Sequence, residues 1–152
     1  QTKYRTMINT ISFEQIYPIW QQHLWPTRQS KIERTSAMKF LGGYDIENMS
    51  FTPTFFGYFF NNQLVGVNSG HGCSNGGYRS RGLFVFPEFR KHGIGIQLLR
   101  AATTQAITEN AYCIWSYPKL SSWSTYDKAG FALASEWEHS ELGINAYAVK
   151  VF

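Results

Sequence analysis

The chain has 152 residues, of which 43% are hydrophobic and 16% are charged. This composition excludes a disordered chain and a coiled coil, and the length suits one globular domain over residues 1–152. The formal net charge of +4 favours an anionic partner without naming one. The sequence contains no apolar run long enough for a membrane helix and no recognisable signal peptide. We therefore expect a cytoplasmic protein with no membrane partner.

The first half of the chain predicts a strand, a helix and a hairpin. Residues 4–9 alternate as a strand does, and Ser12 with Gln15 forms the pattern of a capping box. Apolar residues at helical spacing predict a helix from there to Leu24, with a kink at Pro18. We expect a short helix over residues 36–41. Residues 55–60 and 64–73 predict two strands joined by a tight turn at two asparagines.

The second half predicts two further helices between strands. Residues 78–86 and 112–117 read as strands, and residues 93–110 read as an amphipathic helix. Ser121 or Ser122 is expected to cap a short helix that ends at Gly130, before two last strands over residues 131–137 and 146–152. This order predicts an α/β (α+β) fold with one mixed sheet and helices on both sides.

The segment 83–99 carries the most chemical information. A strand stops at Pro87, and Gly93-Ile94-Gly95 then opens a helix whose first N–H groups form an anion site. Arg90 and Lys91 add positive charge. A dinucleotide fingerprint fails because Leu98 replaces the third glycine, and a P-loop fails because no Gly-Lys-Ser/Thr is present. A glycine pair alone also fits a plain strand-to-helix turn.

The longer pattern resembles a known family. Leu-x-Val-x-Pro-x-x-Arg-x-x-Gly-x-Gly-x-x-Leu-Leu over 83–99 is similar to the acetyl-CoA-binding motif of the GNAT superfamily of N-acetyltransferases. Tyr126-x-Lys128-x-Gly130-Phe131 is similar to a second signature of that family. The resemblance implies a GNAT-type central mixed, mostly antiparallel sheet of about 6–7 strands flanked by about four helices. It also implies acetyl-CoA as co-substrate and no metal.

In such a fold the strand that ends near Val85 diverges from the strand 112–117, and pantetheine lies in the opening. Backbone amides of 91–96 hold the pyrophosphate, and an N–H near Val85 polarises the thioester carbonyl. The cofactor-binding residues implied are Phe84, Val85, Phe86, Arg90, Lys91, His92, Gly93, Ile94, Gly95, Ile96 and Ser122. Lys119 stands where the family often has asparagine. Either Lys119, Ser121 and Ser122 contact the cofactor, or the loop simply differs.

The resemblance makes Tyr126 the candidate general acid that protonates the departing thiolate. The family's glutamate base does not carry over, because Arg79 and Ile114 occupy the corresponding positions. Our first substitute as general base is His71, whose ordinary pKa near 6.5 suits the task. A structural histidine is the alternative reading. Weaker candidates are Glu136, Glu138 and His139, and a water chain would need none of them.

The leading hypothesis is an N-acetyltransferase that moves an acetyl group from acetyl-CoA to a primary amine in a ternary complex. The alternative is a catalytically inactive acyl-CoA-binding module. The acceptor is a small-molecule or peptide amine, and aromatic residues of 25–50, with Glu33, Asp45 and Glu47, are candidates to receive it. A nucleic-acid partner is disfavoured because the basic residues are dispersed. The resemblance leaves a homodimer open.

Overall fold

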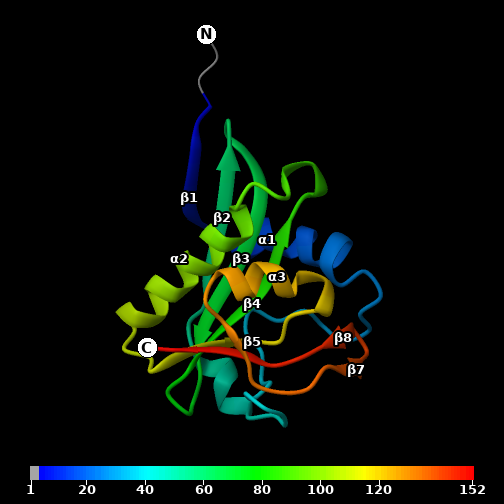
Figure 1. The fold of residues 1–152 in the computed structure, drawn as a ribbon, viewed down its shortest axis with the longest axis vertical. Coiled ribbons are helices and arrows are strands. Elements are labelled where there is room, and N and C mark those ends of the chain that lie inside the picture. Colours follow the sequence, from blue (N-terminus) through cyan, green and yellow to red (C-terminus); the bar gives the residue numbers. More distant parts are fainter. Residues whose placement is uncertain (1–3) are drawn as a thin grey trace.

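The computed structural model describes residues 4–152, whose centre is a seven-stranded sheet (Figure 1). Its strands, in spatial order, are β1 (Thr6–Ile11), β2 (Thr54–Phe60), β3 (Gln63–Gly72), β4 (Tyr78–Val85), β5 (Cys113–Ser116), β9 (Ala148–Val151) and β6 (Ala132–Leu133). All neighbours pair antiparallel except β4 and β5, which are parallel. A separate hairpin joins β7 (Glu138–Ser140) to β8 (Gly143–Asn145). The predicted mixed, mostly antiparallel sheet is confirmed.

Three α-helices cover this sheet, one fewer than the roughly four expected. They are α1 (Phe13–Ile19), α2 (Ile94–Thr108) and α3 (Trp123–Lys128). A π-helical segment, Trp20–Leu24, continues α1, and short 3-10 turns lie at Ile46–Ser50, Pro87–Phe89 and Leu120–Ser122. In Figure 1, α2 and α3 lie in front of the sheet and α1 lies behind it.

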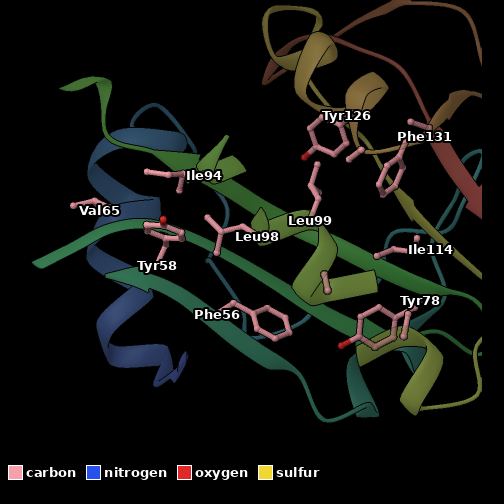
Figure 2. Packing of buried hydrophobic residues seen from close by; sticks show 14 residues of the cluster. Phe56, Tyr58, Val65, Tyr78, Ile94, Leu98, Leu99, Ile114, Tyr126 and Phe131 are labelled. Carbon is pink, nitrogen blue, oxygen red and sulfur yellow. The ribbon is translucent and has the colours of Figure 1, made fainter. Parts of the chain in front are cut away.

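Each face of the sheet has its own apolar core. Phe55 packs with Ile16 and Trp20 of the α1 face, whereas its neighbour Phe56 belongs to the core under α2 and α3. Adjacent strand residues point to opposite faces, so a continuous apolar run serves both cores. Figure 2 shows the second core, in which Leu98 and Leu99 of α2 meet side chains from β2, β3, β4 and β5.

Several local predictions are confirmed in atomic detail. The Ser12 hydroxyl accepts from Gln15 N–H at 3.2 Å, and the Gln15 side chain accepts from Ser12 N–H at 2.9 Å, which closes the capping box. The predicted helix to Leu24 is present, with an α-helical part that includes Pro18 and a π-helical part that begins at Trp20. Asn61 and Asn62 both have positive φ, as a tight hairpin turn requires.

Three local predictions are wrong in whole or in part. Residues 36–41 form no helix, because Leu41, Gly42 and Gly43 all have left-handed φ and turn the chain into a bridge between Met38 and Tyr44. The short helix begins after Ser122, which is its N-cap residue as predicted, but the Ser122 side chain makes no capping hydrogen bond because the 3-10 turn leads directly into the helix. The strand predicted over 131–137 shortens to β6, and the β7–β8 hairpin was not predicted.

The divergence of β4 from β5 is the feature that creates the site. The two strands pair only at Tyr78 with Ile114 and at Arg79 with Trp115. Beyond that point β4 bulges against β3, and Gly82 in the bulge has φ of 79°. The Trp20 indole N–H donates to the Gly82 carbonyl at 2.9 Å, so the segment after α1 holds the bulge in place.

We expect Gly82→Ala to lower the free energy of unfolding by about 2–4 kcal/mol, since it combines a left-handed φ with a steric clash. A Cβ at this position would collide with the Trp20 indole. Gly42→Ala is the matched control, because Gly42 has φ of 121° but nothing within 4 Å of its Cβ position. The control should cost only about 1–2 kcal/mol. Chemical denaturation of both variants measures the difference, and equal costs would contradict the proposed packing of Trp20 on the bulge.

Candidate active site

A cleft of about 760 Å³ opens where β4 leaves β5. One wall is the end of β4 with the loop that follows it and the start of α2. The opposite wall is the segment 119–128. The residues that line the cleft are His23, Leu24, Leu83, Phe84, Val85, Phe89, Arg90, Lys91, Gly93, Ile94, Gly95, Ile96, Lys119, Ser121, Ser122, Ser124, Thr125 and Lys128.

The backbone of β4 presents polar groups to this cleft. Phe86 N–H donates to the Val65 carbonyl of β3 at 3.0 Å. Because backbone groups alternate in direction along a strand, the N–H and C=O of Val85 point the other way, into the opening. The Val85 carbonyl accepts from Arg90 Nε at 2.7 Å, which confirms this direction. Val85 N–H is therefore a donor aimed at whatever enters the cleft.

The start of α2 forms the anion-binding end of the cleft. The chain reaches it through left-handed φ at Lys91 and at Gly93, the N-cap residue. Gln97 N–H donates to Gly93 O at 3.1 Å as the first helical bond, so the preceding amides have no acceptor within the helix. A Cβ on Gly95 would lie 2.9 Å from Thr125 Cγ2, so glycine is needed for α2 to approach α3 this closely. These amides, with the nearby lysines, favour a phosphate.

Most of the predicted cofactor-binding residues share this one cleft. Phe86 and His92 are the exceptions. Phe86 packs against the rings of His23 and Phe84, with centroids 5.1 and 5.2 Å away, and His92 is exposed outside the cleft. Lys119, Ser121 and Ser122 all line the cleft, which favours the reading in which they contact the cofactor.

Two parts of the cleft wall were not predicted from the sequence. His23 and Leu24 come from the π-helical segment, and the sequence gives no signal that this segment reaches β4. Ser124, Thr125 and Lys128 lie on α3. Lys128 belongs to the second family-like signature and the other two directly precede it, so that signature was the available clue.

A second pocket, of about 370 Å³, adjoins the cleft. It lies on the α1 side of the splay and shares Leu24, Leu83, Lys119 and Ser122 with the cleft. The remaining residues that line this pocket are Trp25, Met38, Tyr44, Arg79, Arg81, Gly82, Ser116, Tyr117, Pro118, Tyr126, Ser140, Glu141, Leu142, Asn145 and Tyr147. The cleft and the second pocket therefore meet at the opening between β4 and β5.

Tyr126 lies on the wall of this second pocket. Its side chain is 5% exposed, and its ring packs edge-on against Phe131 with centroids 5.5 Å apart (Figure 2). Burial raises the pKa of Tyr126, while the Ser116 hydroxyl and the charge of Arg79 act in the opposite direction. The phenol is therefore protonated at neutral pH and can act as a proton donor.

The geometry argues against His71 as a general base. Its side chain is 0% exposed and lines neither space. Nδ1 lies 2.9 Å from Gly72 O, and Ser36 N–H donates to Nε2 at 3.3 Å, so both ring nitrogens are already engaged. Burial, with the neighbouring charges of Arg79 and Arg81, lowers the pKa of His71 to about 3. These contacts match the structural alternative.

The acidic candidates are dispersed. Glu138 accepts a hydrogen bond from the Tyr117 hydroxyl at 2.7 Å, and Asp45 caps the 3-10 turn that follows it. Glu33 pairs with Lys31 at 3.7 Å. Of the carboxylates on residues 4–152, Glu141 is the one that lines the second pocket. From the region 25–50, Trp25, Met38 and Tyr44 line the second pocket. Two of them are aromatic, whereas the acidic residues Glu33, Asp45 and Glu47 do not line it.

The sequence and the fold were compared with those of known proteins. The model of the acetyltransferase (GNAT) family matches residues 14–131. The chain belongs to this family. Its fold is similar to IAA acetyltransferase from Bacillus cereus, with a TM-score of 0.70, 14% identity, and 97% of this chain and 100% of the other covered.

Two further GNAT-like structures were solved with ligands. PaiA N-acetyltransferase from Thermoplasma acidophilum, in complex with coenzyme A, has a TM-score of 0.64 at 16% identity. A protein from Bacillus anthracis, in complex with acetyl coenzyme A, has a TM-score of 0.65 at 12% identity. Each match covers 97% of this chain and 99% of the other. A comparison with curated proteins finds no match.

Within residues 4–152, no helix is long and apolar enough to cross a membrane. No group of three or more His, Cys, Asp or Glu side chains in the same range is arranged to hold a metal ion.

The pH dependence of stability tests the environment of His71. Because its pKa is about 3 in the folded chain against 6.5 for an ordinary histidine, only the unfolded chain takes up a proton between these values. Stability should therefore fall as pH drops below 6.5, by about 1.4 kcal/mol per pH unit. Between pH 6.5 and 5, the free energy of unfolding should fall by about 2 kcal/mol in the wild type.

His71→Gln is the control, since it removes the titrating group and should flatten this part of the profile. Urea denaturation across the pH range measures both chains, and NMR follows the imidazole directly. An imidazole that titrates between pH 6 and 7 would contradict the structural reading and restore His71 as a candidate base.

Proposed function

We propose that the protein is an N-acetyltransferase that moves an acetyl group from acetyl-CoA to a primary amine in a ternary complex. The observation that carries this proposal is that the cleft and the second pocket meet where β4 diverges from β5. On one side, Val85 N–H and the start of α2 face a large cleft; on the other, Tyr126 faces a separate pocket. Acetyl-CoA in the cleft and an amine in the second pocket could therefore meet between β4 and β5.

The donor groups of the cleft support coenzyme A as its ligand. The amides of Ile94, Gly95 and Ile96, with Lys91 and Lys128 nearby, are placed to hold the pyrophosphate. The exposed edge of β4 at Val85 can pair with the amide groups of pantetheine. Arg90 now occupies the Val85 carbonyl, so a ligand that bonds to this carbonyl would displace the Arg90 side chain.

The proposed reaction needs a hydrogen-bond donor to the oxyanion and a proton donor to the departing sulfur. The acceptor nitrogen attacks the thioester carbonyl carbon, the C–N bond forms, and the C–S bond breaks. Val85 N–H is the candidate donor to the oxygen that becomes negative in the transition state. Tyr126 is the candidate acid that protonates the departing sulfur. The proton lost by the amine goes to solvent through the second pocket, since His71 is occupied.

Binding and transfer are tested separately. Calorimetric titration of the wild type with acetyl-CoA should show saturable binding, and an amine panel should then release free thiol. Ser124→Glu places a negative charge on the cleft wall and should weaken acetyl-CoA binding about tenfold at low salt, less at high salt. Ser50→Glu, at an exposed serine outside the cleft, should leave binding unchanged. No saturable binding by the wild type would contradict the proposed function.

Tyr126→Phe tests the proton donor. Because the phenol is proposed to act only on the departing sulfur, we expect turnover to fall about 10²–10⁴-fold while acetyl-CoA affinity changes little. Tyr78→Phe is the control, since Tyr78 is a core phenol whose hydroxyl is buried without a hydrogen-bond partner among the described residues. Steady-state kinetics and calorimetry measure both properties, and unchanged turnover of Tyr126→Phe would remove Tyr126 from the mechanism.

One observation favours a second function, an acyl-CoA-binding module without catalysis. The positions at which the family often carries its glutamate base hold Arg79 and Ile114, and Ile114 is fully buried in the core. The same amine panel separates the two functions. Saturable binding of acetyl-CoA without thiol release, over every class of acceptor, would favour the module.

A further inference from the structure

Two arginines of β4 line the second pocket. Arg79 and Arg81 lie two residues apart, so they project from the same face of the strand. They are 9% and 3% exposed, which is unusual for charged side chains. The Arg79 guanidinium lies 5.1 Å from the centre of the Trp115 ring, and the Arg81 guanidinium lies over both Trp20 and Trp25, at 4.9 and 5.1 Å from the ring centres.

Neither guanidinium has a counter-ion within residues 4–152. The ion pairs there are Lys31 with Glu33 and Arg34 with Glu14. Arg81 donates to the Glu33 carbonyl at 2.8 Å, so one of the N–H groups of its guanidinium has a hydrogen-bond partner. Arg79 Nε is buried and has no hydrogen-bond partner among the described residues. A buried cation without a partner is costly, so Arg79 is a site that a ligand anion would stabilise.

The rest of the pocket limits what such a ligand can be. Trp25, Tyr44, Tyr117 and Tyr147 supply aromatic wall, and the volume of about 370 Å³ is at the small end for ligand pockets. Glu141 is the single carboxylate among the lining residues, against Arg79, Arg81 and Lys119. This balance disfavours a polyamine or another polycation and suits a small acceptor with one negative group.

We propose that the acceptor is a small amine that also carries a carboxylate, an amino acid or a close analogue, and that Arg79 binds this carboxylate. The inference rests on the proposed acetyltransferase function and names its acceptor class. A carboxylate matches the planar guanidinium fork and carries one charge. A phosphate monoester carries nearly two, and the second guanidinium is already partly engaged by Glu33 O.

The first test compares acceptors of the wild-type protein. Thiol release from acetyl-CoA is measured with L-amino acids, their carboxamides, the corresponding decarboxylated amines, phosphoethanolamine and spermidine. The best amino acid should exceed its own carboxamide in kcat/KM by about ten- to hundredfold, the range expected for a hydrogen bond to a charged group. A carboxamide, spermidine or phosphoethanolamine that equals or exceeds the best amino acid would overturn the carboxylate assignment.

The second test measures ligand binding at Arg79 in the absence of any reaction. N-acetylated amino acids carry the carboxylate but no free amine, and their binding is followed by tryptophan fluorescence or by the ¹⁵N resonance of Arg79 Nε. We expect saturable binding that Arg79→Met abolishes and that Arg79→Lys weakens about tenfold, since lysine keeps the charge and loses the fork. Binding that is unaffected in Arg79→Met would overturn the proposal.

Arg34→Met is the matched control. Arg34 also stacks on an aromatic ring, with its guanidinium 4.8 Å from the centre of Phe13, but lies outside the pocket. This variant should keep the carboxylate preference. In Arg79→Lys, the KM for amino acids should rise while kcat and the affinity for coenzyme A stay near the wild type, which a purely structural role would not produce.

The two proposals fail in different ways. Acetylation of amines without preference for a carboxylate would overturn this inference and support the acetyltransferase. Binding of N-acetylated amino acids through Arg79, with no thiol release for any amine, would support the anion site and contradict the acetyltransferase.

Discussion

The whole site depends on β4 keeping its bonds to β3 while losing those to β5. Parallel pairing stops after Arg79, and the backbone of Val85 is then left facing open space instead of a neighbouring strand. The bulge at Gly82 produces this change of direction, and the Trp20 indole holds the Gly82 carbonyl. A helix on the far face of the sheet thus positions the backbone donors of the cleft. The polar groups that the cleft offers to a ligand thus include main-chain groups that the sheet leaves unpaired.

The parts of the site that could be predicted from sequence are those encoded by neighbouring residues. The segment 83–99 contains a strand end, a proline, a loop and a helix start, and together with the resemblance to the family this order predicts an anion site. The second pocket draws on segments as far apart as Trp25, Tyr44, Tyr117 and Glu141, and no local pattern shows that they meet. His71 illustrates the same limit. Its strand could be predicted, but its bond to Ser36 could not.

The predictions of short helices and strands were wrong for a related reason. A helix over 36–41 satisfies local propensity, yet three consecutive left-handed residues at Leu41–Gly43 reverse the chain, and that reversal brings Tyr44 to the second pocket. The β7–β8 hairpin has three-residue strands, too short for an alternation pattern to be recognised. Both departures lie beside the second pocket, where tertiary contacts outweigh local preference.

The buried arginines also bear on the missing base. A lysine-like amine with pKa near 10.4 is neutral in only about one molecule in a few thousand at pH 7. A buried positive charge near the nitrogen disfavours the ammonium form and so lowers the pKa of the amine. Arg79 would be neutralised by the acceptor's own carboxylate, which otherwise stabilises the ammonium, and Arg81 would remain to act on the amine. In the proposed reaction, arginine at position 79 therefore removes a proton acceptor, and the charge of Arg81 makes it easier for solvent to deprotonate the amine.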